Sequence, residues 1–152
     1  MDIRQSYREA AVRGATPVQL VVRLYEQIVE DLRQVAIAVE NKNIRQRGEK
    51  IKHAILVVAH LQSSLDFAKG GEVAKNLDQF YNSLRQNLVK VQFHPSKMAV
   101  QQLITDVMAV RSSWIEVERI EGGKVGSVEV AAETAVAARA PETEHARVDW
   151  EG

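Results

Sequence analysis

Cysteine is absent from this 152-residue chain, so it can form neither a disulfide nor a thiolate metal site. Only three prolines and eight glycines occur, which favours helices over sheets. No stretch approaches the roughly 18 apolar residues that a membrane span needs, and the first residues lack the apolar core of a signal peptide. We therefore expect one soluble, cytoplasmic domain with no membrane insertion.

Acidic residues show no excess over basic ones: there are 20 of each, so the formal net charge is zero. This balance argues against a dedicated nucleic-acid-binding protein. The charge is unevenly placed, because residues 1–121 hold 17 basic and 14 acidic residues, whereas residues 122–152 hold three and six. This last segment is rich in Ala, Glu and Val and has one aromatic residue, Trp150. It cannot bury enough apolar surface to offset its ordering entropy, so we predict a mostly disordered tail.

Four long segments repeat apolar residues every three or four positions, which is the period of an α-helix. The first begins at a capping box, Thr16-Pro17-Val18-Gln19. Each segment has one broad apolar face and the connections are short, which is typical of antiparallel neighbours. The sequence therefore predicts an all-α, up-down-up-down four-helix bundle over 16–121, preceded by a short N-terminal arm over 1–15. The expected helices run from Thr16 to about Asn41, and over about 44–67, 72–93 and 96–121.

Two adjacent glycines, Gly70 and Gly71, interrupt the helical pattern between the second and third segments. Glycine readily adopts the left-handed conformation that ends a helix, and a glycine pair suits a tight reversal. We therefore expect the second helix to end near Phe67 and the third to begin near Glu72.

No arrangement typical of catalysis occurs: there is no Gly-rich phosphate loop, no Ser-His-Asp set and no inward carboxylate pair. Glu49, His53 and His60 share a side of the second helix, but a bundle metal site needs carboxylates from facing helices. We therefore expect no catalytic residue, no metal site, no cofactor and no enzymatic activity.

His60 allows one alternative function. The segment from Ala59 to Ser64 is faintly similar to the phosphate-accepting site of histidine phosphotransfer bundles. In those proteins a lysine and a glycine soon follow the histidine, whereas this chain has Gln62, Ser63 and Ser64 there. A boundary histidine on a mixed face is the simpler interpretation, and phosphotransfer remains the alternative hypothesis.

A basic run surrounds the start of the second helix, and it has two interpretations. Solvated charge at the end of a bundle is the ordinary one, and contact with an acidic partner is the other. A third class of function, a bundle that only forms a homodimer through an exposed apolar face, also stays open. The basic residues are Lys42, Arg45, Arg47, Lys50 and Lys52.

Seven short elements, taken in order, resemble those of the FliS family of flagellar export chaperones. Their order and spacing agree from about residue 3 to residue 120. Phe80 stands where the family usually has leucine, and the tail after Gly122 is longer than usual. The elements are Tyr7; Ala15-Thr16-Pro17; Leu24-Tyr25; Ser64-Leu65-Asp66 with Gly70-Gly71; Ala74-Lys75-Asn76-Leu77; Phe80-Tyr81; and Trp114.

The resemblance implies a cytoplasmic export chaperone rather than an enzyme. Members of the family bind the C-terminal segment of new flagellin, which is disordered in the free subunit and helical in the filament. Covering this segment prevents premature polymerisation and keeps the subunit ready for the flagellar type III export apparatus. Flagellin and components of the export gate are thus the expected partners.

The resemblance also suggests candidate site residues. In the family the N-terminal arm packs near the flagellin-binding surface and is rearranged when flagellin binds. We therefore expect Ile3 and Tyr7 to form a self-plug. The candidate groove residues are Leu20, Leu24, Tyr25, Leu65, Leu77 and Tyr81.

Overall fold

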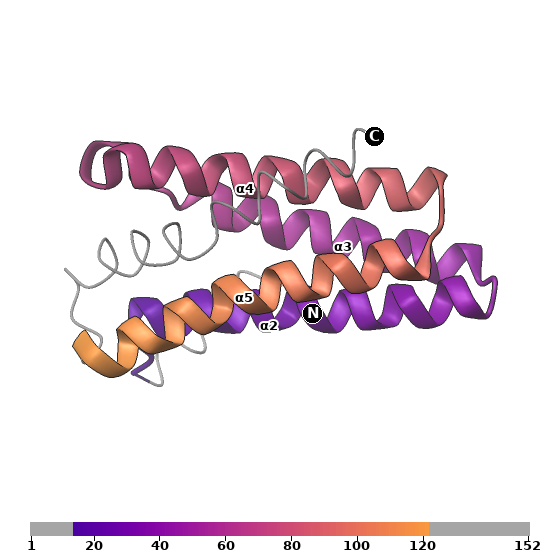
Figure 1. Ribbon diagram of the computed structural model, residues 1–152, viewed down its shortest axis with the longest axis horizontal. Coiled ribbons are helices and arrows are strands. Elements are labelled where there is room, and N and C mark those ends of the chain that lie inside the picture. The colour runs from indigo at the N-terminus through magenta and orange to yellow at the C-terminus, as the bar shows by residue number, and fades with distance from the viewer. Residues whose placement is uncertain (1–13, 122–152) are drawn as a thin grey trace.

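The computed structural model describes residues 14–121, which form four helices joined by short connections (Figure 1). Residues 1–13 of the predicted arm over 1–15 and the whole of the predicted disordered tail over 122–152 lie outside the described residues. Within the described range the chain is helical and contains no strand, so the prediction of an all-α bundle is confirmed. The helices are α2 (Pro17–Glu40), α3 (Ile44–Ser63), α4 (Phe67–Phe93) and α5 (Lys97–Glu121).

Consecutive helices run in opposite directions, but the four do not pack evenly. Helix α2 packs extensively on α3 and on α5, and α4 packs on α3, whereas α4 and α5 contact each other only slightly. In Figure 1, α4 lies along the top of the molecule and α2 and α5 lie together at the bottom. Helices α4 and α5 are therefore the least tightly packed of the helices that follow each other in the chain.

The predicted capping box starts α2 as expected. The Thr16 hydroxyl accepts a hydrogen bond from the Gln19 amide at 3.1 Å, and the Gln19 side chain accepts one from the Thr16 amide at 3.0 Å. These bonds satisfy two backbone donors at the helix terminus. The same hydroxyl lies 3.1 Å from Glu118 Oε1, so it also ties the start of α2 to the end of α5.

The predicted break at Gly70 and Gly71 is present, but it does not directly follow α3, whose predicted end near Phe67 is wrong. Helix α3 ends at Ser63, and α4 begins at Phe67, four residues before Gly71. Asp66 caps α4, because its carboxylate accepts a hydrogen bond from the Lys69 amide at 3.0 Å. Gly71 has φ 51° and ψ −128°, so it interrupts α4 inside the helix. One helical turn over 67–70, capped by Asp66, thus precedes the break, and the long helical run of α4 begins after Gly71, as predicted.

The apolar faces of the four helices meet in one core. Tyr25, Tyr81 and Trp114 are its buried tyrosine and tryptophan residues, and aliphatic side chains surround them. No described helix is long and apolar enough to cross a membrane. The core aliphatic residues include Ile28, Leu32, Val35, Ile51, Val58, Leu61, Leu77, Leu84, Leu88, Val91, Leu103, Val107 and Val110.

Candidate functional site

The six candidate groove residues come from α2, α4 and the connection before α4. All but Leu65 are buried side chains, and Leu65 is half-buried. Ile3 and Tyr7 lie outside the described residues. The buried candidates are Leu20, Leu24, Tyr25, Leu77 and Tyr81, of which Leu24, Tyr25, Leu77 and Tyr81 belong to the main core.

Tyr25 and Tyr81 form a direct contact between α2 and α4. Their hydroxyl oxygens are 2.8 Å apart, and the rings meet edge to face with centroids 6.3 Å apart and planes at 75°. Edge-to-face contact is a favoured geometry for aromatic pairs. Phe80 extends the cluster, with its ring centroid 5.8 Å from that of Tyr81. Sequence spacing put both tyrosines on helix faces but gave no sign that they pair.

Burial controls the ionisation of both phenols. It raises the pKa of Tyr25 to about 12, an effect that the nearby Tyr81 hydroxyl and Trp114 indole partly offset. Burial also raises the pKa of Tyr81 well above its usual range, and the neighbouring Tyr25 raises it further. Both groups therefore stay protonated at neutral pH, so the pair offers apolar area and hydrogen bonding without charge.

Trp114 brings α5 to the same place. Its indole is buried and close enough to Tyr25 to affect that pKa, but its N–H makes no hydrogen bond of good geometry within residues 14–121. The aromatic cluster of Tyr25, Phe80, Tyr81 and Trp114 therefore joins α2, α4 and α5. It supplies core contacts to α4 and α5, whose direct contact is slight.

A second apolar surface, which the sequence did not predict, lies between α3 and α4. This α3–α4 groove has a volume of about 260 Å³. Leu56 and Val89 are 52% and 45% exposed, so its walls present apolar side chains to solvent. Both are apolar residues next to predicted core positions rather than on them. This extra apolar character is the sequence feature that could have indicated the groove. The lining residues are Gly48, Ile51, Lys52, Ile55, Leu56, Val89 and Gln92.

Polar contacts between α3 and α4 lie on either side of this groove. Toward the end of α3, the Gln62 amide donates to Asp78 at 2.7 Å and to Asn82 at 2.8 Å. Toward its start, the Arg47 guanidinium donates to the Gln92 carbonyl at 3.1 Å. The two helices are thus hydrogen-bonded on both sides of the apolar groove.

The histidines and carboxylates of α3 engage other parts of the bundle. His53 Nδ1 lies 2.6 Å from Asp31 Oδ2 on α2, whereas Glu49 pairs with Arg45 at 3.2 Å. Glu49 and His53 thus have separate partners. Asp31 is buried, and this burial raises its pKa, while the hydrogen bond and charge of His53 oppose the rise. His60 is half-buried in the last turn of α3.

Residues 1–121 match the family model described as flagellar protein FliS. The chain is 31% identical over 106 residues to the flagellar secretion chaperone FliSB of Pseudomonas aeruginosa, covering 70% of this chain and 84% of the relative. It is 26% identical over 117 residues to the flagellar secretion chaperone FliS of Vibrio cholerae, covering 74% and 86%. The relative in Salmonella typhimurium, also named flagellar secretion chaperone FliS, is 26% identical over 110 residues. By this match, which spans all four helices, the chain belongs to the flagellar protein FliS family.

Proposed function

We propose that this protein is a flagellar export chaperone that binds the C-terminal segment of flagellin in the cytoplasm. The family match over the entire described bundle is the observation that carries the proposal. The names of the relatives, which are flagellar secretion chaperones, support an export role. The expected consequence is a subunit kept unpolymerised and ready for the export apparatus.

The bundle has the physical properties that such a role requires. A segment that folds on binding lays apolar side chains onto a helical surface, and each buried anchor contributes about 1.5–3 kcal/mol. Ordering the segment costs several kcal/mol, so binding is tight but reversible. The weak direct contact between α4 and α5 supports a position beside the aromatic cluster, because a bound segment would add packing there.

The aromatic cluster is buried, and this burial bears on how flagellin would reach it. Tyr25 and Tyr81 are only 1% and 2% exposed, so a segment that contacts them must first displace the groups that cover them. We propose that Ile3 and Tyr7 of the N-terminal arm act as a self-plug that flagellin replaces. The wall of the flagellin groove would then consist of Leu20, Leu24, Tyr25, Leu65, Leu77 and Tyr81.

The alternative function, histidine phosphotransfer at His60, gains no support from the comparisons. The family match covers all of α3, including His60, and the relatives are named as chaperones. A homodimer and a contact with the export gate remain compatible with the chaperone proposal, and each would need its own test.

Titration calorimetry tests the chaperone proposal directly. The full chain would be titrated with a peptide of the C-terminal segment of flagellin from the same organism. We expect saturable binding near one peptide per chain, with a dissociation constant of about 1 μM or lower, because several buried anchors exceed the ordering cost. A titration that gives no binding heat at tens of micromolar peptide would reject the proposal. A scrambled peptide of the same composition is the matched control.

A full-length variant tests the self-plug separately. Ile3→Ser together with Tyr7→Ser removes both apolar anchors of the arm. If the arm competes with flagellin, the variant binds the peptide several-fold more tightly, since less must be displaced. Equal affinity with equal thermal stability would reject the plug while leaving the chaperone proposal intact.

A further inference from the structure

The α3–α4 groove is apolar at its centre and its surroundings are basic. Lys52 lines it, Arg85 lies one helical turn before Val89, and Lys90 directly follows Val89. Residues 44–63 and 79–96 together hold six basic residues and one acidic residue. The groove therefore favours an acidic segment that carries an apolar anchor.

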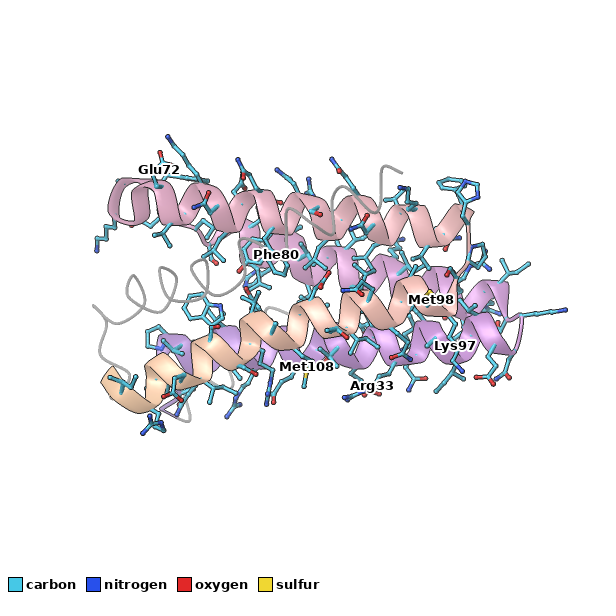
Figure 2. All side chains as sticks on the ribbon, viewed as in Figure 1. Arg33, Glu72, Phe80, Lys97, Met98 and Met108 are labelled. Carbon is cyan, nitrogen blue, oxygen red and sulfur yellow. The ribbon has the colours of Figure 1, made fainter. Side chains whose placement is uncertain are left out.

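Exposed apolar side chains extend the groove toward the connection between α4 and α5. Phe93 is 73% exposed and follows Val89 by one turn, and Ile44 is 66% exposed and precedes Gly48 by one turn. Figure 2 shows this end of the bundle at the right, near Met98, which is also exposed. Four of the large exposed apolar residues thus gather along one face of α3 and α4.

Residues 141–152 of the same chain have the complementary composition. They hold four acidic residues and one arginine, and their one aromatic residue is Trp150, between Asp149 and Glu151. These residues also lie beyond the family match, which ends at residue 121. The family match therefore assigns these residues no role.

We propose that the acidic C-terminal segment docks in the α3–α4 groove of its own bundle, with Trp150 as the anchor. An indole ring fits a groove of about 260 Å³, and the flanking Asp149 and Glu151 would face Lys52 and Arg85. The docked segment would cover apolar surface that the four helices leave open.

The length of the tail permits this contact. Helix α5 is 25 residues long, so Glu121 lies about 37 Å from the groove end of the bundle at 1.5 Å per residue. If residues 122–149 link the two as an unstructured chain of 28 residues, their root-mean-square span is about 30 Å and their maximum reach is far longer. Because span and distance are similar, the effective concentration is on the order of 1 mM. If the tail bound the groove with a dissociation constant of ~0.1 mM as a separate peptide, the tethered tail would therefore be docked in most molecules.

Nuclear magnetic resonance of the full chain tests the proposal. The protein has two tryptophans, Trp114 in the core and Trp150 in the tail, so its indole N–H groups give two assignable signals. Trp150→Phe assigns the tail signal. We expect the Trp150 indole to show a heteronuclear Overhauser effect like that of the buried Trp114. A freely mobile Trp150 indole would overturn the proposal.

Charge reversal provides matched variants for the same signal. Lys52→Glu should weaken docking roughly tenfold, because attraction to the acidic segment becomes repulsion. Lys69→Glu makes the same change at an exposed position in the first turn of α4 and should leave the Trp150 signal unchanged. The Trp114 signal reports whether each variant is folded. Equal effects of the two variants, or none from Lys52→Glu, would contradict docking in this groove.

A spin label locates the segment and identifies its source. The chain has no cysteine, so Gln86→Cys places a single label on α4 three residues before Val89. Arg33→Cys places the control label on the edge of α2 that faces away from α4 (Figure 2). We expect only the Gln86 label to broaden the Trp150 signal. If the broadening appears between labelled and unlabelled molecules and scales with concentration, a second copy occupies the groove and the intramolecular proposal fails.

Discussion

At the scale of single residues, the Tyr25–Tyr81 hydroxyl pair is a direct polar contact between α2 and α4. The two buried hydroxyl oxygens are 2.8 Å apart, so one hydroxyl donates a hydrogen bond to the other. A buried hydroxyl left without its partner costs about 1–3 kcal/mol, whereas removing both partners can be nearly neutral. The pair should therefore behave as one energetic unit.

A double-mutant cycle tests this coupling. We expect Tyr81→Phe alone to lower the free energy of unfolding by about 1–2 kcal/mol, because the Tyr25 hydroxyl loses its partner. The double variant Tyr25→Phe with Tyr81→Phe should cost clearly less than the sum of the single changes. Urea denaturation, followed at constant m-value, measures all three. Strictly additive costs would show that the hydroxyls do not depend on each other.

Asp31 is the second residue whose surroundings predict a measurable effect. Burial raises its pKa in the folded state, so between about pH 4 and that raised value the folded protein holds a proton that the unfolded chain releases. Its contribution to the free energy of unfolding is present in full below about pH 4 and is lost as pH rises through the folded-state pKa. His53, Gln27 and Lys50, which also face Asp31, limit this loss.

Asp31→Asn isolates this contribution. The asparagine keeps the shape of the aspartate and the oxygen that accepts from Gln27, but it cannot ionise. The free energy of unfolding of the variant, relative to that of wild type, should therefore increase as pH rises above about 4. The difference changes by at most about 1.4 kcal/mol per pH unit. Urea denaturation at several pH values between 3.5 and 7 provides the measurement. A difference that is constant with pH, or that moves the other way, would contradict the raised pKa of Asp31.

At the scale of helices, the sequence predicted the number, order and polarity of the elements, because long apolar periods and the Thr16 capping box are local signals. It placed the end of the second helix near Phe67 instead of Ser63 and missed the helical turn before Gly71, because the capping strength of Asp66 depends on where the preceding helix ends. It also missed the Tyr25–Tyr81 pair and the α3–α4 groove. Both depend on which helices become neighbours and how far apart they lie, which are properties of tertiary packing.

Two glycines in helices should respond oppositely to the same substitution. Gly71 has a positive φ that alanine rarely adopts, so Gly71→Ala should cost about 1–3 kcal/mol. At Gly48 a Cβ would lie 3.5 Å from the Gln92 side chain, an ordinary contact, so Gly48→Ala should stabilise by up to about 1 kcal/mol.

Thermal and urea denaturation of the two variants form a matched comparison, because each adds one methyl group within a helix. Loss of stability at Gly48 would mean that the groove floor tolerates no added atom. An unchanged or raised stability at Gly71 would mean that α4 can continue through this position without its interruption.

At the scale of the whole molecule, α2 packs extensively on α3 and α5, an aromatic cluster joins α2, α4 and α5, and an apolar groove lies between α3 and α4. The family match assigns the first 121 residues to FliS proteins, and the sequence already indicated this from seven short elements in register. The sequence could not distinguish the six candidate residues of the flagellin groove from core residues, because a leucine on a helix face serves either purpose. Five of the six candidates are buried, so any direct role for them requires displacement of covering groups.

Flagellin polymerisation is the measurement that tests the central proposal most directly. Monomeric flagellin from the same organism would be seeded and followed by light scattering, with and without an equal concentration of this protein. We predict that filament growth stops near one chain per flagellin, because the C-terminal segment is covered, and that an added excess of the free C-terminal peptide restores it. Unchanged growth at a several-fold molar excess of the folded chain would contradict the proposed function.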